Sequence, residues 1–215
     1  MRSTFARYAI NAVLKNRVWW WKFAAPHARL FSYLGIGHEP KVWGALRQAK
    51  GNLFVDVGSG YGWYVSLLRQ NFNRLVAIDA DPEVVSWLRL HAPANCEVLN
   101  LAISEKDGKV TLDRDPADFI RQLAIIEGPS VRGLTARSRS LSSLFPSAQI
   151  DLIKVDVEGG EWLVLKGAHQ IMHQVRAWLI ELHDPTRKAE LASYMAQSYG
   201  YKSAWVDDFH AYFWR

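Results

Sequence analysis

The sequence predicts an α/β protein with a mostly parallel seven-stranded sheet, helices on both faces of that sheet and a C-terminal antiparallel hairpin. Three observations predict this fold class. From residue 53 onward, short apolar runs rich in β-forming residues alternate with helical patterns, which is typical of a parallel sheet. A glycine turn at residues 58–62 directly follows the first of these runs. The chain ends with two aromatic-rich runs joined by an Asp-Asp turn, which favours a closing hairpin.

The first half of the predicted sheet contains three strands. They are expected at Leu53–Val57, Leu75–Asp79 and Glu97–Ile103. A helix over residues 61–71 is expected directly after the glycine turn. A second helix begins at Pro82 and runs to His91. Proline suits the first helical turn because the N–H group that it lacks would have no helical partner there.

The middle of the chain is less regular. Residues 109–112 and 135–140 are expected to be short extended pieces on either side of residues 113–133. That segment contains two prolines and two glycines, and it is expected to include a short helix. A long insertion beside such a sheet often binds substrate or forms a lid. The segment fits a plain surface excursion as well, so both interpretations stay open.

The second half of the chain returns to alternating strands and helices. Strands are expected at Asp151–Asp156, Ala177–Leu182, Tyr201–Val206 and His210–Trp214. The helix after the first of these strands is expected to bury an apolar stripe made of Ala168, Ile171, Met172 and Val175. The next helix is expected at Lys188–Tyr199, with Gly200 as its C-terminal cap.

The charge of the chain is concentrated at its beginning. Residues 1–50 carry nine Lys/Arg and one acid, Glu39, a net charge of +8, and four of the ten tryptophans. We therefore divide the 215 residues into a basic, Trp-rich helical extension over residues 1–50 and one domain over residues 51–215. Such an extension can meet nucleic acid or an anionic membrane surface. The alternative is a helical flap whose aromatic side chains pack onto the domain.

Composition predicts a cytoplasmic protein. The single cysteine, Cys96, excludes an internal disulfide framework and favours a reducing compartment. No run approaches the ~18 to 20 consecutive apolar residues of a membrane span. Charged residues interrupt the only candidate signal peptide. A peripheral position on the membrane, with Trp19–Trp21 docked at its surface, is the alternative.

The most informative motif is Phe54–Trp63, in which a strand feeds a G-x-G-x-G turn and then a helix. Glycines let the backbone turn sharply and let a ligand approach it. Asp79 ends the second strand about twenty residues later, where its carboxylate can accept hydrogen bonds from both ribose hydroxyls. Asp56, at the head of the turn, would repel a pyrophosphate. The pattern therefore favours a sulfonium amino-acid cofactor over a dinucleotide.

Several motifs together resemble the FkbM family of methyltransferases, from about Glu39 to Leu182. They are Gly37–Pro40, Phe54–Gly62, Ala77–Pro82, Asn100–Ser104 and, most specific of all, the I-D-L-I-K-x-D-x-E-G-x-E run of Ile150–Glu161 followed by Val164–Ala168. The chain departs from the family pattern in Leu141-Ser142, where Leu-Asp is common. It also has Gly58-Ser59-Gly60 in place of the commoner Gly-Ala-Asn.

The resemblance implies a Rossmann-like class I methyltransferase fold for residues 51–215 and S-adenosylmethionine as the cofactor. The residues that it leads us to expect around the cofactor are Asp56, Gly58, Ser59, Gly60, Tyr61, Gly62, Asp79, Ala80, Asn100, Ala102, Ile103 and Asp156. The segment from Asn100 to Ile103 is expected on the adenine side. Asp156 is expected to face the methionine part or the reacting atom.

Methyl transfer to a hydroxyl is assisted by a base. Both Asp156 and His183 follow strands of the parallel sheet, so their side chains can converge at one edge. We expect Asp156 or His183 to be the base, with Glu158 orienting it. The alternatives are a surface cap for His183 and helix N-terminal roles for Glu158 and Glu161. The grouping of Asp, Glu and His could also hold a divalent metal, as in some O-methyltransferases. No ligand-spacing motif indicates a metal, so none is expected.

Three functions remain open from the sequence. The first, which the resemblance favours, is O-methylation of a hydroxyl on a small molecule or a glycan. The second is methylation of tRNA or rRNA, which the basic extension would bind in a salt-dependent way. The third is a non-catalytic interaction protein that has kept the fold. The sequence does not indicate an oligomeric state.

Overall fold

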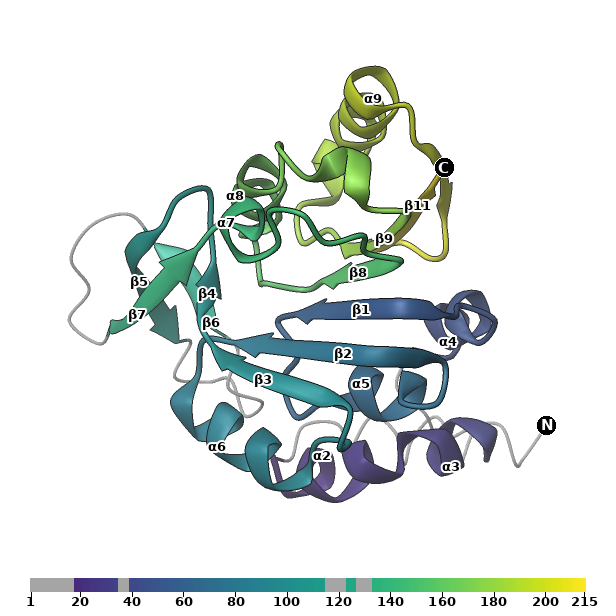
Figure 1. Ribbon diagram of the computed structural model, residues 1–215, viewed down its shortest axis with the longest axis vertical. Helices are drawn as coiled ribbons and strands as arrows, with labels where there is room; N and C mark the ends of the chain where they lie inside the picture. Colours follow the sequence, from purple (N-terminus) through teal and green to yellow (C-terminus); the bar gives the residue numbers. More distant parts are fainter. Residues whose placement is uncertain (1–17, 35–38, 115–122, 127–132) are drawn as a thin grey trace.

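The computed structural model describes residues 18–34, 39–114, 123–126 and 133–215, and it has the predicted α/β architecture. Its larger sheet has seven strands in the order β10-β11-β9-β8-β1-β2-β3 (Figure 1). Neighbouring strands from β9 to β3 are parallel, whereas β11 pairs antiparallel with both β9 and β10. The predicted fold class, a mostly parallel sheet with a C-terminal hairpin, is confirmed. The features predicted for residues 1–17, for Gly37-His38 and for most of 113–133 lie outside the described residues.

The strands of this sheet lie close to the predicted positions. They are β1 (Gly51–Val57), β2 (Phe72–Asp79), β3 (Cys96–Asn100), β8 (Leu152–Val155), β9 (Ala177–Glu181), β10 (Lys202–Trp205) and β11 (His210–Trp214). Strand β1 lies between β2 and β8, with Asp56 opposite Lys154. Because these strands are parallel, their carboxyl ends reach the same edge of the sheet, and ligands of open α/β sheets bind at that edge.

Helices cover both faces of the sheet, as predicted (Figure 1). They are α2 (Val18–Ala24), α3 (Ala28–Tyr33), α4 (Pro40–Leu46), α5 (Trp63–Leu68), α6 (Pro82–His91), α7 (Leu141–Leu144), α8 (Glu161–Gly167) and α9 (Lys188–Tyr199), with 3₁₀ turns at Ala25–His27, Met172–Gln174 and Pro185–Arg187. Helices α7 to α9 form one apolar core with the sheet, and α2 to α6 form the other. The carboxyl edge is the part of the sheet that this packing leaves for a ligand.

Two predicted helix ends are confirmed in detail. Asp81 caps α6 by accepting a hydrogen bond from the Glu83 N–H at 2.8 Å, and Pro82 occupies the first helical turn. Helix α9 spans the predicted residues and ends at Gly200. Because α6 begins directly after β2, the Asp81 cap also fixes the turn that follows Asp79.

A second sheet of four strands, in the order β4-β7-β5-β6, was not predicted as a sheet, but two of its strands confirm the extended pieces predicted at residues 109–112 and 135–140. Its strands are β4 (Ala102–Ile103), β5 (Gly108–Arg114), β6 (Leu123–Ile126) and β7 (Leu134–Arg139). The single strand predicted over 97–103 is wrong because β3 ends at Asn100, and Ala102 and Ile103 pair with β7 of the second sheet. The short helix expected within 113–133 is absent from its described residues, where 123–126 pair with β5 as a strand.

Helix α8 is shorter than predicted. It ends at Gly167, and the stripe residues Ala168, Ile171, Met172 and Val175 are buried in turns that follow it. At this end of the helix two backbones approach closely, since a Cβ on Gly167 would lie 2.2 Å from Ser104 O. After Gly167 the backbone forms hydrogen bonds between residues three apart, such as Ile171 N–H to Ala168 O at 2.9 Å. The chain therefore continues in tighter turns and not as an α-helix.

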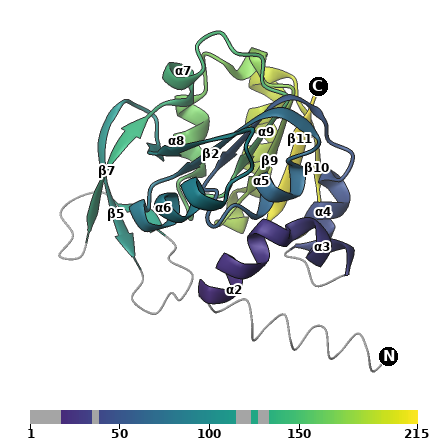
Figure 2. The same cartoon turned by 60° about the horizontal axis from the view of Figure 1, so that its bottom comes forward.

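The described part of the basic extension packs onto the domain. Trp20 is buried, and its ring meets Phe31 edge-on at a centroid distance of 5.1 Å. Trp21 meets Trp63 of α5 in the same way at 6.0 Å. Figure 2 shows α2 and α3 on the side of the sheet that carries α5. Within the described ranges, none of the helices has both the length and the apolar character needed to cross a bilayer.

Candidate active site at the carboxyl edge of the sheet

The loop after β1 presents bare backbone at the carboxyl edge. Gly58 and Gly60 have φ values of 75° and 50°, a left-handed conformation that glycine adopts without strain. The Gly60 N–H donates a hydrogen bond to Asp79 Oδ2 at 2.9 Å. A Cβ on Gly60 would meet no heavy atom within 4 Å. The loop is therefore tied to β2 and open toward the space in front of it.

Asp79 stands at the end of β2 with both carboxylate oxygens engaged by backbone. Its Oδ1 accepts from the Asp81 N–H at 2.9 Å, while Oδ2 accepts from Gly60. Burial raises the pKa of Asp79 to about 6, although the two backbone hydrogen bonds act in the opposite direction. Each oxygen keeps a further lone pair, so the ionised carboxylate can still accept hydroxyl donors.

A cavity of about 220 Å³ lies between the glycine loop, Asp79 and the end of β8. The predicted cofactor residues that line it are Gly58, Ser59, Gly60, Tyr61, Asp79, Ala80, Ala102, Ile103 and Asp156. Three others, Asp56, Gly62 and Asn100, are not on its wall. Instead, the Asn100 side chain donates to the carbonyls of Asp79 and Ala80, each at 3.1 Å, and so holds the turn behind the cavity.

Asp56 is a buried carboxylate behind the loop. It is 0 % exposed, and neither of its oxygens has a hydrogen-bond partner among the described residues. Burial raises its pKa to about 7, with the opposing attraction of Lys154 and smaller repulsions from Asp156 and Asp79. Asp56 thus lies behind the cavity, opposite Lys154 on the adjacent strand, whose positive charge attracts it.

Lys154 is a buried cation that holds Asp156 at the cavity. Its Nζ lies 2.9 Å from Asp156 Oδ2 and 4.8 Å from the centre of the Tyr64 ring. Burial works against the charge of Lys154, but the carboxylates of Asp156 and Asp56 outweigh it and raise the pKa of the amine. The ion pair therefore fixes the direction of the Asp156 carboxylate, which lines the cavity.

The three predicted catalytic side chains lie together. His183 Nε2 is 3.0 Å from Glu158 Oε2 and 3.9 Å from Asp156 Oδ1. Glu158 has a φ of 50°, a conformation that costs a residue with a side chain about 1–3 kcal/mol and is concentrated at functional sites. The strained backbone supports a role for Glu158 in the function of the site. The alternative from the sequence is that Glu158 only stabilises the start of α8.

His183 is held between carboxylates on both sides of its ring. Its Nδ1 lies 2.8 Å from Glu161 Oε1, and Glu161 also accepts the Gly159 N–H at 2.9 Å. Burial would lower the pKa of His183, but the hydrogen bonds to Glu158 and Glu161 outweigh it and raise the pKa to about 11. At neutral pH this histidine is therefore an imidazolium ion that orders the acids around it.

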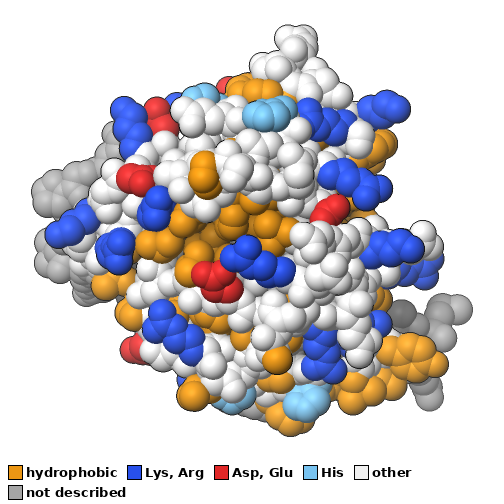
Figure 3. All heavy atoms as spheres, viewed as in Figure 1, with side chains coloured by type: hydrophobic (Ala, Val, Ile, Leu, Met, Phe, Trp, Pro, Cys, Tyr) orange, Lys and Arg blue, Asp and Glu red, His pale blue; other side chains and the backbone are white. Residues whose placement is uncertain are grey.

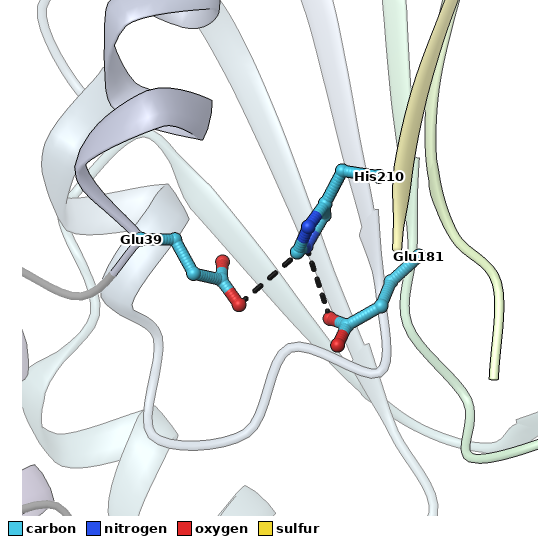
Figure 4. Close-up of side chains that lie close together, drawn as sticks. All are labelled: Glu39, Glu181 and His210. Carbon is cyan, nitrogen blue, oxygen red and sulfur yellow. Dashed lines mark ion pairs between the residues drawn. The ribbon is translucent and has the colours of Figure 1, made fainter. Parts of the chain in front are cut away.

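A second histidine cluster was not predicted from the sequence. Glu39 precedes α4, Glu181 ends β9 and His210 begins β11, and the three side chains point toward one another (Figure 4). Glu39 and Glu181 both line the cavity, and the Tyr64 hydroxyl donates a hydrogen bond to Glu39. The only sequence signal was the predicted hairpin, because His210 faces Glu181 once β11 pairs with β9.

The chemistry of the site follows from its two ends. Near the glycine loop, Asp79 offers acceptors beside an apolar wall that includes Ile78 and Ile103. At the other end, several ionisable side chains from β8, β9 and the segment before α4 surround the cavity, namely Glu39, Lys154, Asp156, Glu158 and Glu181. The site can hold a molecule with a hydroxylated sugar, a flat apolar part and a cationic group, next to groups that can accept a proton.

Comparison with known proteins agrees with this arrangement. Residues 56–203 match the family described as the methyltransferase FkbM domain. No curated protein matches the sequence. Among solved structures, precorrin-6y C5,15-methyltransferase from Geobacter metallireducens is 9% identical with a TM-score of 0.50, covering 83% of this chain and 89% of that one. At this identity the similarity shows a common fold.

Two further solved structures are similar. Precorrin 8w decarboxylase from Methanobacterium thermoautotrophicum is 15% identical with a TM-score of 0.47, covering 82% of this chain and 90% of that one. An rRNA methylase from Streptococcus thermophilus is 12% identical with a TM-score of 0.47, covering 82% of this chain and 92% of that one.

Proposed function

The chain belongs to the FkbM methyltransferase domain family, and from this premise we propose that it transfers a methyl group from S-adenosylmethionine to a hydroxyl of a small molecule or a glycan. One observation carries the proposal: a single cavity is lined by the open Gly60 backbone, the Asp79 carboxylate and the Asp156 carboxylate. The first two suit an adenosyl group, and the third suits the reacting end.

The residues present fit the cofactor. Asp79 would accept the ribose hydroxyls, and the adenine would lie against Ala102 and Ile103. Gly60 leaves room for close approach because no heavy atom lies within 4 Å of where its Cβ would be. Asp156 and Glu158 would attract the positive sulfonium and amino groups. When bound, S-adenosylmethionine supplies a methyl carbon activated by a positively charged sulfur.

The chain's own residues then align the acceptor and remove its proton. The new bond joins the acceptor oxygen to the methyl carbon, the carbon–sulfur bond breaks with its electron pair left on sulfur, and the hydroxyl proton leaves. We assign Asp156 as the base, since Lys154 Nζ lies 2.9 Å from its Oδ2 and keeps the carboxylate at the cavity wall. Alignment can contribute about 7–11 kcal/mol to such a displacement, and a base about 10²- to 10⁴-fold in rate.

Within this proposal His183 positions groups rather than accepting the proton. Its raised pKa of about 11 keeps it protonated at neutral pH. The imidazolium binds Glu158 and Glu161 at 3.0 and 2.8 Å, on opposite sides of its ring. It thereby holds Glu158 in its strained backbone conformation next to Asp156.

RNA is the second acceptor class to test. Trp20 and Trp21, which the RNA interpretation would use, pack against the domain. On the face shown in Figure 3, Lys and Arg side chains are scattered among acidic and uncharged ones and do not form one continuous patch. We therefore place hydroxyl acceptors first and treat RNA binding as an outcome of the experiment.

The experiment measures cofactor binding and turnover separately. Calorimetry with S-adenosylmethionine should give saturable heat and a raised melting temperature, whereas NAD should give neither. Formation of S-adenosylhomocysteine is then followed with a panel of hydroxylated small molecules and oligosaccharides, and with RNA at low and high salt. Turnover with RNA alone would replace the hydroxyl proposal. If S-adenosylmethionine produced neither heat nor a thermal shift, the third function, a non-catalytic interaction protein, would be favoured.

A further inference from the structure

Three side chains from distant parts of the chain converge on one point beside the cavity. Glu39 comes from the segment before α4, Glu181 from the end of β9 and His210 from the start of β11 (Figure 4). Donor atoms of the three side chains all lie within 4.8 Å of one another. We propose that these residues bind a divalent first-row transition-metal ion, of which Zn²⁺ is the best match, at the cavity wall. The inference rests on this geometry and goes beyond the methyltransferase function.

His210 has the orientation of a metal ligand. The residue is only 3 % exposed, and its Nδ1 lies 2.9 Å from Asp207 Oδ1, so the ring is fixed by a carboxylate. Ligating histidines almost always bond their other ring nitrogen to such a group. The Nε2 atom points between Glu39 and Glu181 and forms ion pairs with both carboxylates (Figure 4). One ring nitrogen is therefore held by Asp207, and the other converges with two carboxylates, which is the arrangement of a metal-ligating histidine.

The distances suit a metal of zinc's size. His210 Nε2 lies 3.2 Å from Glu181 Oε2 and 3.5 Å from Glu39 Oε1. Bonds of about 2.0–2.1 Å in a tetrahedral site place neighbouring ligand atoms about 3.3–3.4 Å apart. The two separations bracket that value. An ion could therefore be seated between the three donors with small side-chain adjustments.

The charges also favour a cation at this point. Two of the three proposed ligands are carboxylates, Glu39 and Glu181, and the Asp156 carboxylate lines the same cavity. The Tyr64 hydroxyl bonds to the Oε2 of Glu39 and leaves Oε1 on the side of His210. A divalent ion would neutralise the two acids that now face each other.

The donor set selects the kind of metal. One imidazole and two carboxylates suit Zn²⁺ and neighbouring first-row ions, whereas Mg²⁺ and Ca²⁺ prefer sites made of oxygen alone. Three protein ligands leave a fourth position, as in zinc sites that bind water or substrate. Because Glu39 and Glu181 line the cavity, that position would face it.

The test measures metal binding to chelator-treated, full-length protein without cofactor. Titration with Zn²⁺ should give one tight site per chain, and Mg²⁺ should not compete. His210→Gln should weaken Zn²⁺ binding by more than about 100-fold, and Asp207→Asn by about 10- to 100-fold. If His210→Gln does not fold, Glu181→Gln with a normal melting temperature answers the same question.

The matched control is His183→Gln. His183 lies in a comparable cluster with Asp156 and Glu158, whose donor atoms are also within 4.8 Å of one another. The proposal expects this variant to bind Zn²⁺ like the parent protein. Loss of binding in His183→Gln with retention in His210→Gln would overturn the assignment, and so would absence of tight Zn²⁺ binding in the parent protein.

A spectroscopic readout separates the metal site from the methyltransferase function. Co²⁺ loaded in place of Zn²⁺ should show the intense visible absorption of a four-coordinate site with nitrogen and oxygen ligands, and His210→Gln should abolish it. S-Adenosylmethionine binding is measured on the same samples. Metal binding without cofactor binding would refute only the proposed function. Cofactor binding without the Co²⁺ spectrum would refute only the metal site.

Discussion

A Cβ placed on Gly58 would lie 1.6 Å from the backbone carbonyl oxygen of Asp156. The first glycine of the loop after β1 and the acid after β8 are thus packed backbone against backbone, and the Asp156 N–H donates to Val57 O at 3.0 Å. This contact fixes the glycine loop and Asp156 relative to each other, and the proposed function needs both at the cavity wall. Since the obstructing atom belongs to the backbone, no side-chain rotation can relieve it.

Gly58→Ala should destabilise the protein and disturb the cofactor site at once. The left-handed φ of 75° and the backbone clash both oppose the added methyl group. Costs of about 1–3 kcal/mol for the conformation and a similar amount for the overlap are expected. Chemical denaturation should therefore show a loss of at least about 2 kcal/mol, and S-adenosylmethionine binding should be lost in any folded fraction.

Gly60→Ala is the matched comparison, because Gly60 has the same left-handed conformation without an obstructing atom. Only the conformational cost of about 1–2 kcal/mol applies. The new methyl group would stand in the space that the loop leaves open, so cofactor affinity should fall while the protein remains folded. Equal stability losses in the two variants would contradict the role given to the Gly58–Asp156 contact.

The parts of the site that follow from sheet topology could be predicted from the sequence. Parallel strands bring their carboxyl ends to one edge, so the glycine turn, Asp79 and Asp156 had to approach one another once the strands were recognised. Their side chains do line one cavity. The same argument placed His183 near Asp156, and His183 Nε2 lies 3.9 Å from Asp156 Oδ1.

The parts that depend on register and irregular backbone could not be predicted. His210 meets Glu181 only because β11 pairs with β9 in one particular register, which the sequence pattern does not define. Glu39 reaches the cluster from a left-handed backbone position that its residue type does not suggest. Asn100 was expected at the cofactor and instead bonds to two backbone carbonyls, because its strand ends one residue before the chain changes sheets.

Asp79→Asn should weaken S-adenosylmethionine binding by about 10- to 100-fold, the equivalent of a hydrogen bond to a charged group. The amide also places an N–H₂ group against the N–H donor of Gly60 or of Asp81. Calorimetry measures the affinity, and thermal unfolding of the free protein measures the structural cost. Glu83→Gln, at an exposed position near the start of α6, should change neither. An unchanged affinity in Asp79→Asn would remove the ribose assignment.

Asp56→Asn should change how stability depends on pH. Burial raises the folded-state pKa of Asp56 from 3.8 to about 7. The folded protein therefore holds a proton that the unfolded chain releases above pH 3.8, so stability falls as pH rises from about 4 to about 7. The amide of the variant cannot ionise, so its stability should decrease less as pH rises over this range.

At pH 8 the Asp56→Asn variant should be more stable than the parent by about 1 kcal/mol, since removal of a buried, unsatisfied carboxylate outweighs the lost attraction to Lys154. Denaturant titrations at several pH values provide the measurement. A variant that is less stable than the parent at pH 8, with the parent's slope below pH 7, would show that Asp56 is ionised and satisfied in the folded state.

Asp156→Asn and His183→Gln together decide which residue is the base. If Asp156 accepts the proton, Asp156→Asn should lower kcat by about 10²-fold or more. The affinity of this variant for S-adenosylmethionine should stay within about tenfold of the parent's. His183→Gln should lower kcat less, because it removes a positioning group, and the dependence of rate on pH should keep its shape.

If His183 were the base, the parent's rate would rise with pH toward the His183 pKa of about 11, and His183→Gln would abolish that rise. Rate profiles of the parent and both variants from pH 6 to pH 10 distinguish these outcomes, since only the histidine mechanism requires loss of a proton that Glu158 and Glu161 hold in place.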